Sequence, residues 1–231
     1  MAVARIKFSR LGPVRYLGHL DMLRYFQKAV MRSGISAKYS EGFHPHQLMS
    51  FAYPLGVGME TKGDYFDLEI TGNESGEEIR DKMNAVMNEG MKVAEAAIMP
   101  EKERAAMAAV AAADYLVEYE CAADWDVNAA IAELMRLEEV LINEGEEEAE
   151  HKGGKKKKAP KDIRPGIIEM RADEGGIFMK LKSGSAMNVR PADVFEKLIK
   201  QEGIFDTCRI TRLIRLEIYK DKDGMLCPLI G

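Results

Sequence analysis

The spacing of apolar residues alternates between period two and helical period along the first 100 residues, and each change predicts a new element. Residues 2–9 alternate, with Arg5 and Lys7 between apolar neighbours, which predicts a half-buried strand. Residues 19–33 follow a helical period, and Gly34 directly after them predicts the end of that helix.

The predicted first helix has two contrasting sides. Its apolar side is expected to be formed by Leu20, Leu23, Gln27 and Val30, with Phe26 and Met31 flanking them. Its basic side is formed by Arg24, Lys28 and Arg32, which recur every four residues. Such a row is typical of a solvated helix face, and it also suits contact with phosphate groups.

Further changes of period predict the remaining elements of this first unit: strands at 37–41, 64–71 and 91–98, and a second helix at 79–87. The resulting β-α-β-β-α-β order is that of a ferredoxin-like unit, in which two helices cover one face of a four-stranded antiparallel sheet. Arg5 and Lys7 alternate with core residues, so they are expected on the uncovered face.

The same order of elements is predicted in the second half. Strands are expected at 114–121, 139–143, 177–182 and 207–219, with helices at 127–134 and 191–199, and the chain is expected to become ordered again at 167–170, before a turn. An acidic block runs into a lysine block and predicts a mobile insertion at about 144–162. The predicted fold is therefore α+β, with two tandem ferredoxin-like units at 1–100 and 114–231. Each has an antiparallel sheet with helices on one face, and an alanine-rich linker helix at 101–113 joins them.

Charge is distributed unevenly along the chain. The net charge of −5 argues against nucleic-acid binding by the molecule as a whole. The first fifty residues, however, contain eight lysines and arginines against two acidic residues, together with three of the four histidines. A basic stretch at the start of an acidic chain predicts an anionic partner for that stretch.

The candidate substrate-binding residues come from this basic stretch, from the irregular segment GFHPH at 42–46 and from one later arginine. They are Arg5, Lys7, Arg10, His19, Arg24, Lys28, Arg32, Phe43, His44, His46 and Arg164. A competing prediction is that Asp67 and Glu69, on a neighbouring strand, pair with Arg5 and Lys7 and neutralise them.

Motifs of independent enzymes are absent from the sequence. It contains no phosphate-binding glycine loop, no HExxH and no GxSxG, so no catalytic residue is assigned. His44 and His46 with His19 would supply three metal ligands, but no cysteine or acidic residue stands at ligand spacing nearby. The pattern therefore favours a polar loop or contact with an anion, and no metal or cofactor is predicted.

Cysteine usage and hydropathy predict a cytoplasmic protein with no membrane partner. Cys121, Cys208 and Cys227 are odd in number and widely spaced, which is poor material for disulfides, and they lack the spacing of an iron–sulfur motif. No apolar run approaches the roughly 20 residues that span a bilayer. The N-terminus lacks the pattern of a secretory signal.

Residues 7–70 closely resemble the start of the radical-SAM-linked family, bacterial proteins encoded beside or fused to cobalamin-binding radical S-adenosylmethionine (radical SAM) proteins. The family's opening pattern is matched by Phe8, Gly12, His19, Leu20, Asp21, Arg32, Gly34, Gly42, Phe43, Pro45, Pro54, Leu55, Gly58 and Glu60. Residues 161–167, KDIRPGI, are similar to its second recurring segment. One departure is Gly18, where the family usually places Ser as the cap of the first helix.

The resemblance implies a partner and leaves the chemistry open. It implies a radical SAM enzyme as the partner protein, with any iron–sulfur cluster held by that enzyme. We therefore expect an accessory, substrate-binding protein that is not catalytic by itself and that binds RNA through its basic first unit. One alternative is an RNA-processing or RNA-modifying enzyme that uses His19, His44 or His46 as acid/base groups. Another is an assembly scaffold that binds no nucleic acid.

Overall fold

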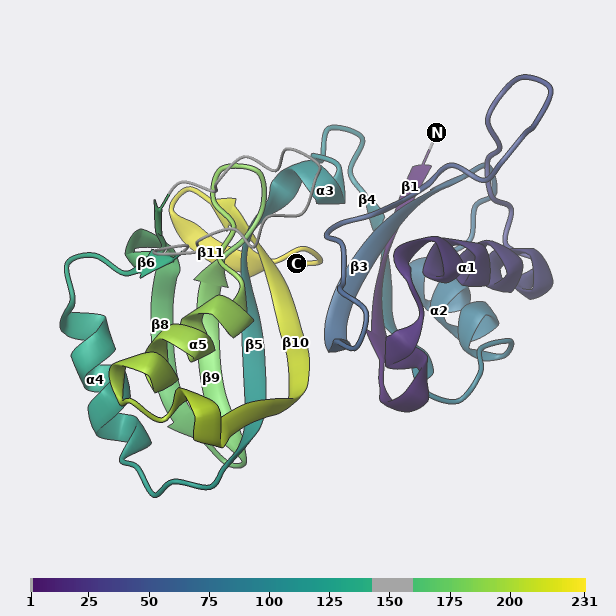
Figure 1. The fold of residues 1–231 in the computed structure, drawn as a ribbon. Coiled ribbons are helices and arrows are strands. Elements are labelled where there is room, and N and C mark those ends of the chain that lie inside the picture. The colour runs from purple at the N-terminus through teal and green to yellow at the C-terminus, as the bar shows by residue number, and fades with distance from the viewer. Residues whose placement is uncertain (1, 143–159) are drawn as a thin grey trace, which may run out of the picture.

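One mixed sheet of nine strands runs through the protein in the computed structural model, which describes residues 2–142 and 160–231 (Figure 1). The strands are β1 (Ala2–Arg10), β2 (Met49–Phe51), β3 (Glu60–Ile70), β4 (Met91–Met99), β5 (Val110–Cys121), β8 (Ile167–Asp173), β9 (Gly176–Lys182), β10 (Cys208–Lys222) and β11 (Met225–Pro228). Their order is β4-β1-β3-β10-β5-β9-β8, with β2 paired to β3 and β11 paired to β10. The predicted α+β class is confirmed.

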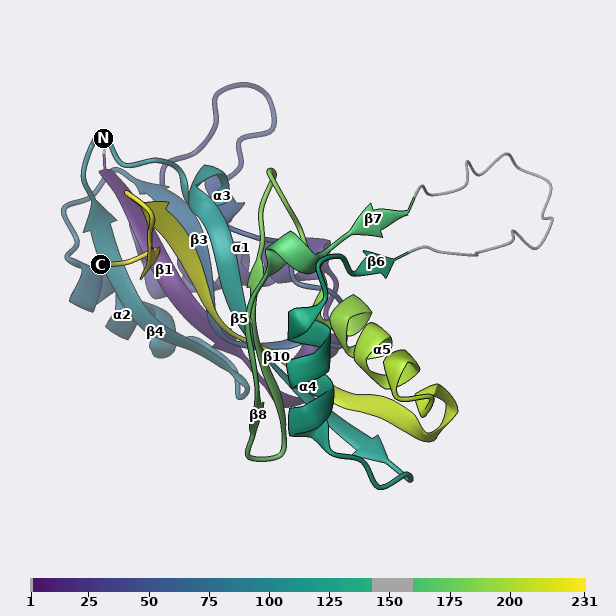
Figure 2. The same ribbon diagram turned by 90° about the vertical axis from the view of Figure 1, so that its left-hand side faces the viewer.

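The helices lie on the faces of this sheet rather than at its ends. They are α1 (His19–Ser33), α2 (Gly76–Asn84), α3 (Ala106–Ala109), α4 (Val127–Arg136) and α5 (Pro191–Gln201), with short 3-10 turns η1 (Gly12–Tyr16), η2 (Arg164–Gly166) and η3 (Phe205–Thr207). Helices α1 and α2 cover one face of the strands β1, β3 and β4. Helices α4 and α5 lie together on one side of β5, β8 and β10 (Figure 2).

Helix α1 has the predicted limits, and its buried side agrees only in part with the predicted apolar side. Gly34 follows it with a left-handed φ of 70°, as expected of a residue that ends a helix. The buried residues are Met22, Phe26, Ala29 and Val30. Leu20 is 65% exposed. Val30 and Phe26 are buried as predicted, whereas Met31 is exposed and Met22 and Ala29 take the place of Leu20. Apolar residues stand on several sides of this helix, and the aromatic core decides which side is buried: the rings of Phe8 and Phe26 lie 4.7 Å apart.

The strand predicted at 37–41 is wrong. Residues 37–48 instead form a loop between α1 and β2, which we call the arm, held by isolated bridges from Ala37 to Ile70 and from Tyr39 to Gln47. The strand that pairs with β3 comes later, at Met49–Phe51. The Lys38 amide donates to the Glu69 carbonyl, and the Glu69 amide donates to the Leu48 carbonyl. Both ends of the arm are therefore attached to the end of β3, and the arm extends beyond the sheet.

The prediction of separate antiparallel sheets is also wrong, because β3 and β10 pair in parallel and join both halves into one sheet. The paired residues are Ile214 with Glu60 and Arg215 with Thr61. The close approach continues at Gly63, where a Cβ atom would stand 2.5 Å from the carbonyl oxygen of Leu216. Only glycine fits there, since any side chain would push the two backbones apart.

The linker between the two halves and the segments beside the predicted insertion contain less regular structure than predicted, or different structure. The expected linker helix at 101–113 shrinks to α3, and β5 already begins at Val110. The expected strand at 139–143 is reduced to β6 (Leu141–Ile142), which pairs with β7 (Lys161–Asp162) in a separate two-stranded sheet. Nearly all of the predicted insertion lies outside the described residues, and the division into two units stays a prediction. Among residues 2–142 and 160–231, no helix is long and apolar enough to span a membrane.

The interpretation that the cysteines are poor material for disulfides is corrected by the sheet register. Cys121 ends β5, Cys208 begins β10, and the two face each other across the strands and form a disulfide. Cys227 in β11 is free. The pairing joins residues 87 positions apart, so it depends on the register of strands that the spacing of cysteines does not reveal.

Candidate functional site

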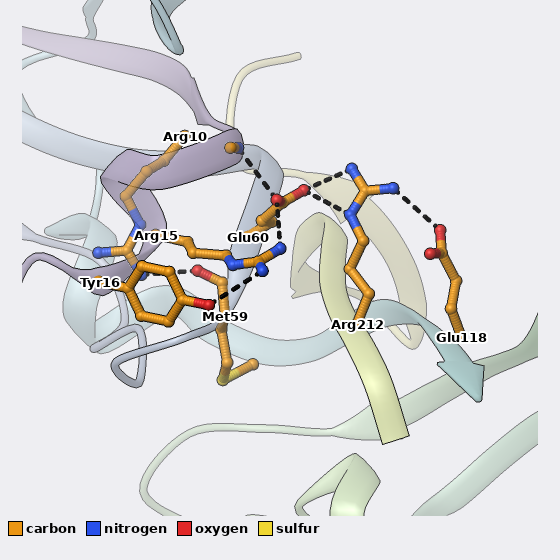
Figure 3. A network of polar contacts seen from close by, with 8 residues as sticks. Arg10, Arg15, Tyr16, Met59, Glu60, Glu118 and Arg212 are labelled. Carbon is orange, nitrogen blue, oxygen red and sulfur yellow. Dashed lines mark hydrogen bonds and ion pairs between the residues drawn. The ribbon is translucent and has the colours of Figure 1, made fainter. Parts of the chain in front are cut away.

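Glu60, at the start of β3, is the centre of a buried polar network between the two halves (Figure 3). Its carboxylate accepts hydrogen bonds from the Gly12 amide at 3.0 Å, from Arg15 at 3.2 Å and from Nε of Arg212 at 2.8 Å. Arg212, in β10, donates further to Glu118 of β5 at 3.1 Å. Burial by itself raises the pKa of Glu60, but the hydrogen bonds from Arg212, Gly12 and Arg15 outweigh it and hold that pKa below its ordinary value.

We call the paired segments of β3 and β10 together with this network the junction. Two further arginines are buried beside it, Arg10 within the first half and Arg215 between β10 and β3. Arg10 is 1% exposed and donates to three backbone carbonyls, those of Leu17, Gly56 and Met59. Arg215 is 2% exposed and donates to the Asp64 carboxylate at 2.8 Å. Burial by itself lowers the pKa of Arg215, and the adjacent Asp64 carboxylate more than reverses this, so the guanidinium stays charged.

The face of β1 expected to be open is covered. Arg5 is 1% exposed, because it makes two hydrogen bonds to Asp67 across the register and also donates to the backbone carbonyls of Arg104 and Leu229. The segment before α3 and the C-terminal segment therefore lie over it. Lys7 pairs with Glu217 of β10, whose carboxylate also accepts from Tyr65. The predicted pairing of Arg5 with Asp67 is present, but Glu69 pairs with Lys38 and not with Lys7.

Arg164 closes the end of α4 rather than facing solvent. Its guanidinium donates to the carbonyl oxygens of Met135 at 2.8 Å and Leu137 at 3.2 Å, at the last turn of that helix. A cation at a helix C-terminus also stabilises the helix dipole. Arg164, at the centre of the segment KDIRPGI, therefore stabilises the end of α4.

The three basic residues of α1 remain at the surface, and we call Arg24, Lys28 and Arg32 the basic row. All three are exposed on the side of α1 opposite its buried residues. Arg24 lies 3.8 Å from Asp21, and Arg32 donates to the carbonyl of Val86 at 3.2 Å. Exposed contacts of this kind are weak and exchange readily for phosphate.

The arm beyond the C-terminal end of α1 presents an aromatic side chain to solvent. Phe43 is 101% exposed at its tip, with His44 exposed beside it. The neck is tied by Ser40 and His46: the Ser40 amide donates to the His46 carbonyl at 2.8 Å, and the His46 amide donates to the Ser40 hydroxyl at 3.1 Å. The basic row and the arm together form the candidate interface.

The three N-terminal histidines do not converge. His19 begins α1, and its ring contacts Phe51 with centroids 5.4 Å apart. His46 stands five residues before Phe51 on nearly extended chain, about 16 Å at about 3.3 Å per residue, and His44 lies further out on the arm. Within the described part of the chain, no group of three His, Cys, Asp or Glu residues is placed to hold a metal ion.

Sequence reasoning missed the residues that build the junction. Arg212, Arg215 and Glu217 stand among apolar residues in the middle of β10, and Asp64 lies in β3. Charged residues between the apolar residues of a predicted strand were the signal, because such groups stay in a core only when paired. Their partners could not be assigned, since β3 and β10 lie about 150 residues apart in sequence.

Comparison with known protein families assigns the chain. Residues 4–191 match the family described as "Uncharacterized protein conserved in bacteria (DUF2344)". The chain belongs to this family. No curated protein matches the chain. The matched residues include the candidate interface and the β3 side of the junction, whereas β10 lies beyond them. The description of the family names no radical SAM enzyme, so that partner stays a prediction.

We expect Glu60→Gln to lower the free energy of unfolding at pH 7 by about 1–3 kcal/mol, because it leaves Arg212 and Arg15 without their carboxylate. The pKa of Glu60 is lowered in the folded state, so its contribution is present above the unfolded pKa and is lost as pH falls through the folded pKa. The difference between wild type and variant should therefore shrink as pH falls below about 4.5. Urea unfolding at pH 7 and pH 3.5 measures this.

The matched control is Glu196→Gln, which removes an exposed pair with Lys200 on α5. It should change stability by less than about 0.5 kcal/mol at either pH. Equal effects of the two substitutions would show that the network around Glu60 adds nothing to the junction.

Proposed function

We propose that this protein is a non-catalytic accessory module that binds single-stranded RNA through the basic row and the arm, and presents it to a radical SAM enzyme. The RNA proposal rests on one observation: some basic residues of the first fifty positions are paired inside the protein, and others are exposed at the surface. Arg5, Lys7 and Arg10 are held by partners inside the protein. The basic row stays at the surface, although the chain as a whole is acidic.

The chemistry of the candidate interface suits a flexible strand better than a duplex. Proteins that bind single strands combine a basic track for the backbone with aromatic rings on which bases stack. The basic row supplies three cations at helical spacing, about 6 Å apart. Phe43 supplies an unobstructed ring at the tip of the arm, the loop that follows the same helix in sequence. A base paired in a duplex would not have a free face to offer that ring.

The strand orders support a finer description of the fold. We infer that each half is a ferredoxin-like unit, because β4-β1-β3-β2 and β10-β5-β9-β8 both follow the order fourth, first, third, second of their own half. The β3–β10 pairing would then join two such units edge to edge. Fold alone assigns no activity, so the RNA proposal rests on the interface.

The radical SAM partner is proposed from the resemblance of residues 7–70 and of KDIRPGI at 161–167 to the radical-SAM-linked family. If RNA occupies the basic row and the arm, the enzyme must dock elsewhere. The two associations are then separable by substitution.

Replacing Arg24, Lys28 and Arg32 together by Gln should weaken RNA binding and flatten its dependence on salt. Each neutralised phosphate contributes about −0.7 to the log–log slope for a single strand, so the slope should fall in magnitude by about 2. Fluorescence anisotropy with a labelled single-stranded RNA between 25 and 200 mM salt, a range on the order of that used for such slopes, measures both quantities.

A control variant with Arg171, Lys200 and Arg209 replaced by Gln removes the same charge from exposed positions in the second half. It should leave the slope unchanged. If both variants weaken binding equally, the attraction is general and the basic row is not the site. If wild type binds no RNA below roughly 100 μM at low salt, the scaffold alternative replaces this proposal.

Phe43→Ala should reduce RNA affinity by about 1–3 kcal/mol while leaving the salt slope intact, because stacking on one base is lost and phosphate contacts are kept. Phe43→Leu keeps an apolar side chain without the flat ring and should lose a similar amount. Both variants should unfold at the wild-type temperature, because the ring is 101% exposed. Restored affinity in the leucine variant would indicate a plain hydrophobic contact.

Anaerobic co-purification with the tagged chain should recover a protein that carries a CxxxCxxC motif, the cluster-binding pattern absent from this sequence. The variant lacking the basic row should recover the same protein but less RNA, because the two partners use different surfaces. Recovery of RNA without any such protein would leave the RNA proposal standing and remove the radical SAM partner.

A further inference from the structure

The disulfide between Cys121 and Cys208 stands at the end of β5 and the beginning of β10, where the sheet meets the turn η3. The two residues are direct partners in the strand register, so no backbone movement is needed to bring their sulfurs together. The next position along the register pairs Arg209 with Glu120, an exposed ion pair at 2.7 Å. The cysteine pair therefore lies at the rim of the sheet and is half-buried, with Cys208 packed against the edge of the hydrophobic core of the second half.

A surface hollow of about 380 Å³ opens directly on this pair, and both cysteines line it. The other lining residues include Thr207 and Arg209. A cavity of this size accommodates a small organic molecule. A thiol of low molecular weight can therefore reach the sulfur atoms without prior unfolding of the strands.

Thr207 gives the pair a group that suits thiolate chemistry. Its hydroxyl oxygen lies 3.7 Å from Sγ of Cys121 and 3.9 Å from Sγ of Cys208. In the disulfide form the hydroxyl donates to the carbonyl of Ile204 at 2.7 Å. Rotation about the Cβ–Oγ bond turns the same proton toward either sulfur, where it would stabilise a thiolate.

We infer that Cys121 and Cys208 form a reversible thiol–disulfide exchange site for a low-molecular-weight thiol. The thiolate of the small thiol attacks one sulfur, the S–S bond breaks, and its electron pair passes to the other cysteine as thiolate. A second small thiol resolves the mixed disulfide. The products are two cysteine thiols and one small disulfide, and the reverse reaction uses that small disulfide as oxidant.

The oxidation state of this site acts on the strand that holds the halves together. Cys208 is the first residue of β10, and Arg212 and Arg215 of the same strand bind carboxylates of β3. The disulfide fixes the beginning of β10 to β5 and closes a chain segment of 87 residues. Closure of a long segment restricts the unfolded chain, so the oxidised protein resists heat better than the reduced one.

The test exposes the purified full chain to buffers with graded ratios of reduced to oxidised glutathione, followed by alkylation and mass spectrometry. Oxidised protein should carry one alkyl group, on Cys227, and reduced protein three. The melting temperature should rise by roughly 5–15 °C on oxidation. Cys121→Ser and Cys208→Ser should each abolish this shift, whereas Cys227→Ser, the matched control, should keep it. Thr207→Val should slow reduction by glutathione without changing the melting temperature of the oxidised form by more than a few degrees.

Two outcomes with the wild-type protein overturn the inference, and one with a variant does so as well. In one, Cys121 and Cys208 stay open to alkylation in excess oxidised glutathione, so no bond forms. In the other, the bond persists in the folded protein under excess reduced glutathione and breaks only in denaturant, which identifies an inert structural cross-link. A redox shift that survives in Cys208→Ser would equally exclude this pair as its source.

Discussion

The parallel contact between β3 and β10 depends on charges that cannot be left unpaired. Arg215 is almost completely buried and needs Asp64, while Glu60 needs Arg212 and Arg15. An isolated charge at such depth costs several kcal/mol, far more than the few backbone hydrogen bonds of this short contact provide. The arginines of β10 and the carboxylates of β3 therefore fix where the two strands meet. A shift by one residue would turn these side chains to the other face.

The pairing of buried charges also determines which basic side chains remain available for an anionic partner. Arg10 binds three carbonyls beneath η1, Arg5 holds the C-terminal segment over the sheet, and Lys7 reaches Glu217 of the second half. Each of these contacts joins segments that are distant in sequence or closes a loop, so their charge serves cohesion. In the part of the chain that the structure describes, Arg24 and Arg32 of the basic row make exposed contacts within the first half, to Asp21 and to the carbonyl of Val86. This is why the surface of α1 is a better candidate for an anionic partner than the sheet.

Local features were predictable from sequence, whereas the relations between segments were not. Alternation in β1 and the helical period of α1 follow from short-range geometry, and Gly34 ended its helix as expected. The apolar side of α1, the disulfide and the β3–β10 junction each depend on a partner far along the chain. The candidate site divides in the same way: exposure of the basic row followed from helical spacing, but the burial of Arg10 depended on carbonyls at Gly56 and Met59.

The exposed ring of Phe43 at the tip of the arm is not explained by the stability of the fold. A fully exposed phenyl ring buries no area and adds nothing to the hydrophobic stabilisation of the fold. Single exposed apolar residues are common on protein surfaces and need no function by themselves. Here, however, the neck between Ser40 and His46 is closed by several hydrogen bonds, which order a loop at a cost in chain entropy. The hydrogen bonds of the neck offset this cost, while the ring at the tip stays exposed to solvent. This is why Phe43 is included in the candidate interface, since its ring is free to contact a partner.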